Sequence, residues 1–98
     1  MTRLYYTTPE HDVFNEVKNK AIDVWIEMYP EDNHPFYAKE KVDRIKDMGN
    51  VSDNLMYIVA MFDLENQLIL ANRLSDNSRK AIRERMIDGG NQPELIVF

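Results

Sequence analysis

The chain lacks cysteine altogether, has only three glycines and four prolines, and contains no long hydrophobic run. The absence of cysteine excludes a disulfide scaffold, a thiolate metal ligand and a cysteine nucleophile. The longest apolar run covers residues 55–62, whereas a helix that spans a membrane needs about 20 apolar residues. The N-terminus also lacks the basic start and apolar run of a secretory signal. We therefore expect a cytoplasmic protein with no membrane contact.

The residue patterns of common catalytic and metal sites are missing as well. There is no Gly-x-Ser-x-Gly elbow, and the three serines stand where predicted helices begin, so helix capping accounts for them. The two histidines, His11 and His34, are far apart in sequence, and neither lies on an apolar face. The acidic loop around His34 has neither zinc nor calcium spacing. We expect no catalytic residue, no metal and no cofactor, and hence no enzyme.

The composition that remains is that of one small globular domain covering residues 1–98. Hydrophobic residues make up 44% of the chain and charged residues 30%. The 17 acidic residues outnumber the 12 basic ones, which gives a net charge of −5. Binding to a nucleic acid or a membrane surface needs positive charge, so neither partner is expected. A helix-turn-helix reading of residues 53–88 stays open but is disfavoured for the same reason.

The apolar spacing indicates a mainly α-helical domain. Thr8 as N-cap and Pro9 at the first helical position predict one helix start, and Ser52 is a plausible cap for another. Gly89 and Gly90 predict where the last helix ends. We predict about four helices, at residues 9–29, 35–48, 53–73 and 76–88.

The third of these helices is the least certain in type, because residues 55–62 are all apolar and periodicity alone does not separate helix from strand. A helix is favoured because the apolar pattern continues past Asp63; a strand at 55–62 followed by a helix from 63 is the alternative. As one helix, this element has two apolar sides and is expected to be the buried centre of the domain. One of those sides consists of Tyr57, Ala60, Met61, Leu64, Leu68 and Ala71.

The two ends of the chain are predicted to be extended. Residues 3–7 favour pleated structure, and residues 95–98 form an apolar end. Exposed chain ends are usually polar, so this tail needs a partner. Either the two segments pair as a short antiparallel β-ribbon, or the tail docks in a groove.

Two surfaces are candidates for binding a partner. The first is an apolar row on the otherwise acidic side of the first helix, formed by Ile22, Ile26 and Tyr29. Another element packing on that side would explain the same row. The second surface is the last helix, because residues 73–87 have a net charge of +3 in an acidic protein. Its candidate partner- or anion-binding residues are Arg79, Lys80, Arg83 and Arg85.

Arginine suits forked pairing with carboxylates and phosphates. The basic side chains could pair with acidic residues of the same chain, with an acidic partner or second copy, or with a phosphate or nucleotide. The sequence favours a small acidic, non-enzymatic protein that binds a protein partner as an inhibitor or regulator. The alternative is a binder of an anionic small ligand or nucleotide through the last helix, with a homodimer as one way to complete the site. Nine asparagines, six methionines and no cysteine resemble, by composition only, the small accessory proteins that phages encode.

Overall fold

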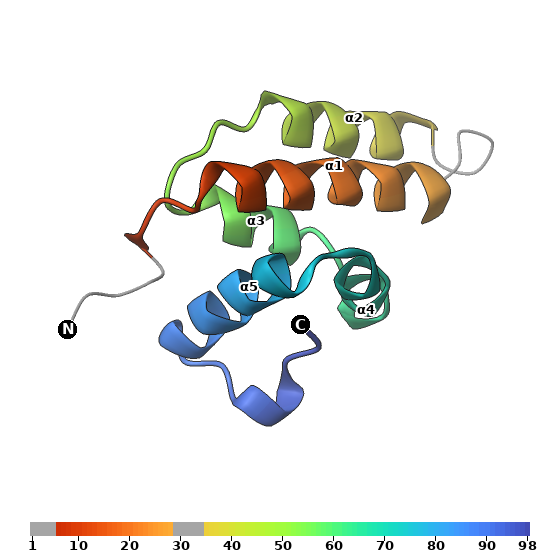
Figure 1. The fold of residues 1–98 in the computed structure, drawn as a ribbon. Helices are drawn as coiled ribbons and strands as arrows, with labels where there is room; N and C mark the ends of the chain where they lie inside the picture. Colours follow the sequence, from red (N-terminus) through yellow and green to blue (C-terminus); the bar gives the residue numbers. More distant parts are fainter. Residues whose placement is uncertain (1–5, 29–34) are drawn as a thin grey trace.

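Five α-helices and one 3-10 turn make up the described part of the chain, which comprises residues 6–28 and 35–98 of a computed structural model, with the backbone alone for residues 35–38 (Figure 1). The predicted helical class is confirmed, and no described residue lies in a β-strand. In chain order the elements are α1 (His11–Met28), α2 (Pro35–Asp47), α3 (Asn54–Ala60), α4 (Leu64–Arg73), α5 (Asp76–Asp88) and the 3-10 turn η2 (Pro93–Leu95).

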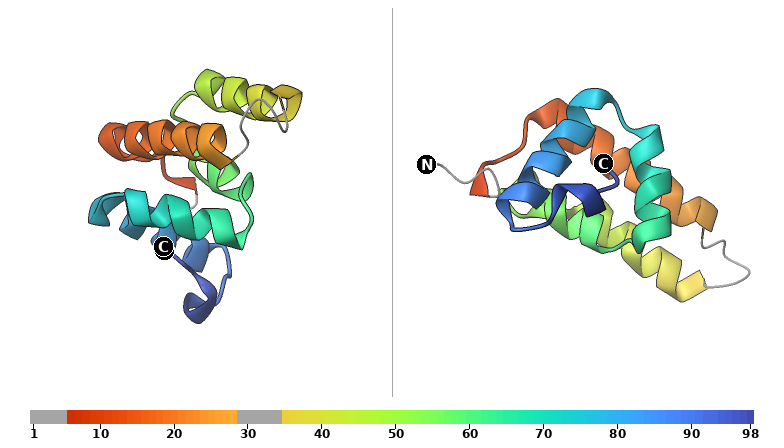
Figure 2. Two further views of the ribbon diagram at one scale, coloured as in Figure 1. Left: turned by 90° about the vertical axis from the view of Figure 1, so that its right-hand side faces the viewer. Right: turned by 90° about the horizontal axis from the view of Figure 1, so that it is seen from below.

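The first helix, α1, is the centre of the fold. It contacts α2, α3, α4 and α5, and Figures 1 and 2 show α2 running alongside it on one side while the other three helices lie on the other. The expectation that the third predicted helix would be central is therefore wrong. The apolar stripe of α1 is buried along most of its length, and its buried members are Val13, Phe14, Val17, Ala21, Val24 and Trp25, whereas Met28 at the end of the stripe is 38% exposed.

The predicted helix at 53–73 is two helices, α3 and α4, that meet at a bend. At the end of α3 the amides of Met61 and Phe62 bond to carbonyls three residues back, at 3.2 and 3.1 Å, which tightens the last turn. The side chain of Asp63 then accepts a bond of 2.9 Å from the amide of Asn66 and caps the next helix. A single helix over 53–73 is wrong, and so is the strand at 55–62.

The bend is fixed from inside the molecule by Phe62. This ring is buried against Trp25 of α1, with 5.6 Å between ring centroids. The amide nitrogen of the Gln67 side chain donates to the carbonyl of Phe62 at 3.1 Å, so a side chain of α4 satisfies a carbonyl that α3 leaves open. Aromatic packing and capping thus both favour two short helices over one long one.

The other helix boundaries agree closely with the sequence. The predicted bounds of the last helix are confirmed by α5, whose N-cap Ser75 accepts from the amide of Ser78. Gly90, with a φ of 97°, allows the chain to turn after it. By contrast, α1 begins at His11, two residues later than predicted, because the Pro9 carbonyl accepts from the side chain of Asn50 at 2.9 Å rather than from the helix.

The C-terminal tail folds back onto the helices instead of forming a strand. After η2 the chain returns and ends between α4 and α5, as Figures 1 and 2 show. Phe98, the last residue, is only 8% exposed and belongs to the hydrophobic core. The β-ribbon prediction is wrong for this tail, and the alternative of docking agrees with the structure. Residues 3–5 of the predicted ribbon lie outside the described residues.

Candidate functional site

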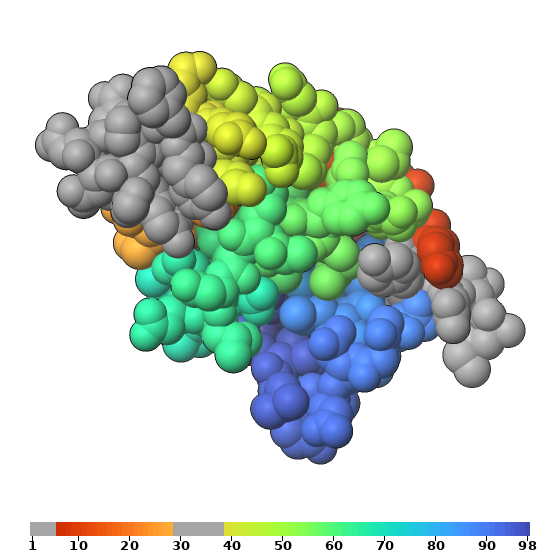
Figure 3. Space-filling view, turned by 180° about the vertical axis from the view of Figure 1, so that it is seen from behind, coloured from red at the N-terminus to blue at the C-terminus, as the bar shows by residue number. Residues whose placement is uncertain are grey.

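The bend between α3 and α4 exposes an apolar surface that a continuous helix was expected to bury. Tyr57 is 54% exposed, Leu64 65% and Leu68 48%. Ala71, at the far end of the same predicted side, stays buried. We call Tyr57, Leu64 and Leu68 the α3–α4 face; in Figure 3, α3 and α4 lie next to each other on one side of the molecule.

The predicted apolar row on α1 is only partly exposed. Ile22 is half-buried and packs against the core, whereas Ile26 is 55% exposed. Tyr29 lies outside the described residues. Among the described residues, Ile26 is thus the member of this row that a partner could reach.

The cations of α5 are mostly bound within their own helix. Arg79 pairs with Asp76, and Lys80 lies 3.9 Å from Glu84. Arg83 donates to a backbone carbonyl of the tail at 3.3 Å. The predicted pairing with the acidic side of another helix is made by a neighbouring residue instead, since Arg73 of α4 pairs with Glu27 of α1.

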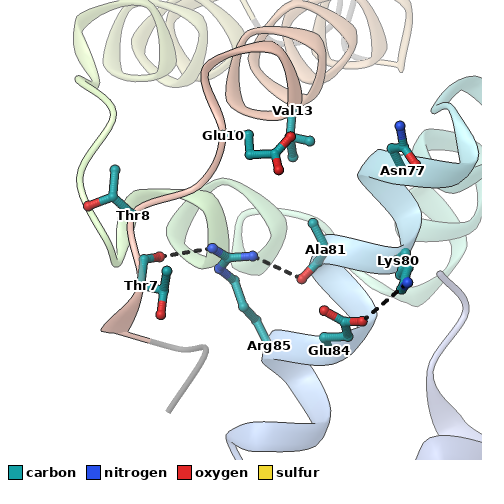
Figure 4. A pocket seen from close by; sticks show the side chains of 9 residues that line it. All are labelled: Thr7, Thr8, Glu10, Val13, Asn77, Lys80, Ala81, Glu84 and Arg85. Atoms are coloured by element: carbon teal, nitrogen blue, oxygen red, sulfur yellow. Dashed lines mark hydrogen bonds and ion pairs between the residues drawn. The ribbon is translucent and has the colours of Figure 1, made fainter. Parts of the chain in front are cut away.

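Arg85 is set apart from the other three because it is a buried residue of the fold. It is 5% exposed, and its guanidinium donates to the carbonyls of Thr7 at 2.8 Å and Ala81 at 3.2 Å. Burial lowers the pKa of Arg85 from its ordinary value. No carboxylate of the described residues lies within 4.0 Å of it. Arg85 therefore ties the N-terminal segment to α5, as Figure 4 shows.

A pocket of about 370 Å³ opens beside Arg85, between the N-terminal segment, the start of α1 and α5 (Figure 4). Its charged lining is balanced, because Lys80 and Arg85 face Glu10 and Glu84. Val13 and two threonines, Thr7 and Thr8, also line the pocket. The pocket brings together two of the four predicted basic residues, Lys80 and Arg85.

An acidic residue of α1 is held by the start of α5. Glu16 accepts from the Ser75 hydroxyl at 2.7 Å and from the Ser75 amide at 3.0 Å. The hydroxyl of Ser78 contributes most to a lowered pKa of Glu16; Ser75 and the charge of Lys20 act in the same direction, while partial burial opposes them. This carboxylate is thus a structural link between α1 and α5.

Neither a metal centre nor a membrane-crossing helix is found in the described part of the chain. Within it, no three His, Asp or Glu side chains gather closely enough to hold a metal ion. The loop with Glu31, Asp32 and His34 lies outside the described residues. None of the described helices combines the length and the apolar character needed to cross a bilayer.

Comparison with known proteins finds no family model, no curated protein and no solved structure that matches this chain. The site is therefore interpreted from its own chemistry. Sequence reasoning missed the α3–α4 face because it extended one helix through Asp63. The signal that could have revealed it is Asp63 itself, an N-cap residue inside an apolar stretch.

Proposed function

We propose that this chain is a non-enzymatic interaction protein that binds a protein partner as an inhibitor or regulator. The observation that carries the proposal is the α3–α4 face, where three large apolar side chains on two consecutive helices are about half exposed or more. Burying a large apolar side chain fully is favourable by about 1.5–3 kcal/mol, so a partner that covers the face gains the part of this free energy that corresponds to the area still exposed. Apolar surfaces rimmed by polar residues are typical of protein interaction sites.

Two further surfaces belong to the same proposal as secondary contacts. Ile26 on α1 is exposed, and an acidic partner could compete with Asp76, Glu84 and the tail carbonyl for Arg79, Lys80 and Arg83 of α5. Charge reversal at Arg79 and Arg83 is expected to weaken partner binding and leave the fold intact. A loss of helicity or thermal stability in that variant would instead assign both residues to the fold.

The decisive experiment compares partner capture by matched surface variants. The tagged chain, the variant Leu64→Ser/Leu68→Ser and the control Leu95→Ser are incubated with a lysate of the organism that carries the gene. Leu95 is 70% exposed and so matches Leu64 in exposure. It lies in η2 and is not part of the α3–α4 face. We expect one partner to bind the wild type and the control and to be lost from the double variant.

All three proteins are expected to fold, because Leu64 and Leu68 are exposed and do not belong to the core. Circular dichroism and a melting curve check this. Equal capture by the wild type and the double variant would overturn the assignment of the α3–α4 face.

A second function, binding of an anionic small ligand or nucleotide, is favoured by the pocket beside Arg85. Its volume of about 370 Å³ lies in the range of small-molecule sites. Lys80 and Arg85 would hold the anion, while Glu10 and Glu84 oppose it. In a thermal-shift panel of nucleotides, a true ligand at a hundredfold excess over its dissociation constant stabilises the protein by about 2.7 kcal/mol.

The matched variants for that panel are Lys80→Gln, which alters the pocket, and Lys46→Gln, which lies on α2. A shift that Lys80→Gln removes and Lys46→Gln retains would support the ligand site. An unmoved melting curve across the panel would exclude it as a nucleotide site.

A further inference from the structure

The α3–α4 face lies in a stretch of chain that has acidic residues and no basic ones. Between Lys46 and Arg73 there is no lysine or arginine, while Asp47, Asp53, Asp63 and Glu65 are all acidic. Residues 21–38 likewise contain no lysine or arginine, but Glu27 in that stretch pairs with Arg73. The bend region is therefore an apolar surface at which a positive partner meets little repulsion.

Three of these carboxylates adjoin the apolar face. Asp53 precedes Tyr57 by four residues and Glu65 precedes Leu68 by three, which places each pair on neighbouring positions of a helix. Asp63 directly precedes Leu64 and stands at the start of α4. The apolar face thus has an acidic rim, contributed by Asp53, Asp63 and Glu65.

Within the described residues, no basic group neutralises this rim. None of the three carboxylates lies within 4.0 Å of a lysine, arginine or histidine, whereas on α2 Asp43 pairs with Lys39 at 2.8 Å and Glu40 with Arg44 at 3.0 Å. Asp63 accepts from the Asn66 amide, and one oxygen of Asp53 is buried without a hydrogen-bond donor. The negative charges of Asp63 and Glu65, which are both exposed, are therefore available to a partner.

The shape of the face favours a helix as the element that binds it. Leu64 and Leu68 are one helical turn apart, the spacing at which a second helix presents its own i and i+4 side chains. The described residues offer no β-strand, so a partner strand has no sheet edge to extend there. The helical spacing of the two leucines therefore favours side-chain packing against a partner helix.

Resting on the proposed function, we infer that the α3–α4 face binds an amphipathic helix of a partner protein, whose apolar stripe packs on Tyr57, Leu64 and Leu68. Its flanking lysine or arginine residues meet Asp63 and Glu65. Helix-in-groove recognition of this kind reads apolar anchors at i, i+3, i+4 and i+7, and the charges set orientation and specificity.

The basic helix α5 of a second copy fits the face less well than a helix with an apolar stripe. It carries Arg79 and Arg83, but the large apolar side chain that it exposes is Ile87, and Ile82 is fully buried. One exposed apolar side chain does not make a stripe that could cover three. Self-association is therefore an outcome that the test must detect, not the expected one.

The test uses three fluorescent synthetic peptides of roughly 18 residues, about five helical turns. The first has a leucine stripe flanked by lysine, the second the same stripe flanked by glutamate, and the third has the first composition in scrambled order. Binding is followed by fluorescence anisotropy at low salt and at about 0.5 M salt. We expect the lysine peptide to bind at least about tenfold more tightly than either other peptide, with a smaller preference at high salt.

Matched protein variants separate the two parts of the recognition. Leu64→Ser/Leu68→Ser should reduce affinity for the lysine peptide by about tenfold or more, and Leu95→Ser should not change it. Asp63→Asn/Glu65→Gln should narrow the preference for lysine over glutamate; asparagine remains a good N-cap, so α4 stays capped.

Equal or tighter binding of the glutamate peptide would overturn the inferred partner chemistry, and equal binding of the scrambled peptide would reduce it to unspecific charge attraction. If the lysine peptide does not bind while Leu64→Ser/Leu68→Ser still abolishes partner capture, this inference fails and the proposed function stands. If capture is unaffected too, both fail. Light scattering that shows a dimer dispersed by the same double variant would assign the face to a second copy.

Discussion

At the scale of single residues, Arg85 is closely held, because its buried guanidinium donates to two carbonyl groups and forms no ion pair within 4.0 Å in the described part of the chain. The bond from its guanidinium to Thr7 joins segments that are 78 residues apart in sequence. The bond to Ala81 lies within α5. A buried cation is costly unless hydrogen bonds or an opposite charge compensate it, and these two bonds do so in part, since the Nε of Arg85 is buried without a hydrogen-bond partner. This residue was predicted as a surface contact, and its location gives it a structural role.

The first prediction concerns the stability of that contact. Replacing Arg85 by alanine should lower the free energy of unfolding by about 1–3 kcal/mol, because buried hydrogen bonds to a charged group and the packing of the stem are lost. Arg83→Ala is the matched control, since Arg83 is partly exposed and makes one bond of 3.3 Å to the tail. Urea unfolding measures both; equal effects for the two variants would contradict the structural role of Arg85.

The second prediction is a pH dependence at Glu16. Hydrogen bonds from Ser78 and Ser75 hold the pKa of Glu16 below its ordinary value in the folded chain. The carboxylate therefore stabilises the fold above the unfolded-state pKa, and that stabilisation is lost as the pH falls through the lower, folded-state pKa. Wild type should be more stable than Glu16→Gln at neutral pH, and the gap in melting temperature should close as the pH falls below about 4.5.

Asp43→Asn is the control for this measurement. The bonded ammonium of Lys39 lowers the pKa of Asp43 as well, but that pair is exposed, so its effect should fade with added salt. The Glu16 effect rests on hydrogen bonds from serine and should persist in salt. A gap for Glu16→Gln that stays constant from neutral to acid pH would contradict the assignment.

At the scale of elements, the bend between α3 and α4 determines which residues face water. The third prediction concerns the N-cap of α4: Asp63→Ala removes this cap and should lower the free energy of unfolding by about 1 kcal/mol. Ser52→Ala is the control, because the N-cap position of α3 is Asp53 and no side chain caps that helix. The Ser52→Ala substitution should change the free energy of unfolding by less than about 0.5 kcal/mol. Similar effects at both positions would mean that the cap of Asp63 does not hold the bend.

Much of the element pattern could be read from the sequence, because α1 and α5 carry strong local signals. The apolar stripe of α1 and the serine and glycine residues around α5 fix those helices with little help from the rest of the chain. The bend has one local signal, the N-cap residue Asp63, and the apolar pattern on both sides of it outweighed that signal. Helix periodicity continues through Met61 and Asp63, and the reason to break there is the packing of Phe62 on Trp25, a contact between residues 37 positions apart.

The candidate site was harder to predict than the fold, since exposure depends on what packs where. A continuous helix would bury Tyr57, Leu64 and Leu68, so the sequence ranked them as core, and the bend places them at the surface instead. The sequence correctly marked Ile26 as an apolar residue on an acidic side, although its neighbour Ile22 packs on the core. The charge pattern of the sequence predicted the basic helix, but it did not predict that Arg85 is buried.

At the scale of the whole molecule, the described chain is one body with a single core around α1. Its radius of gyration is 13.2 Å and its extents are 47 × 28 × 21 Å, so it is clearly elongated. A chain of this length buries only a little over 60% of its unfolded surface, so no part of the core is dispensable. Phe98 belongs to this core, and the N-terminal segment is held outside it by the bond from Arg85 to the carbonyl of Thr7.

The last prediction tests whether the C-terminus is a structural part of that core. Phe98 ends the chain between α4 and α5 and is 8% exposed, whereas Leu95, three residues earlier, is 70% exposed. Phe98→Ala should lower the free energy of unfolding by about 3 kcal/mol, because it removes a buried ring from a small core. Leu95→Ala should change it by less than about 0.5 kcal/mol. Urea unfolding of the two variants against wild type measures the difference. If Phe98→Ala were as mild as Leu95→Ala, the tail would not help to close the core, and its apolar residues would have to be counted with the surfaces open to a partner.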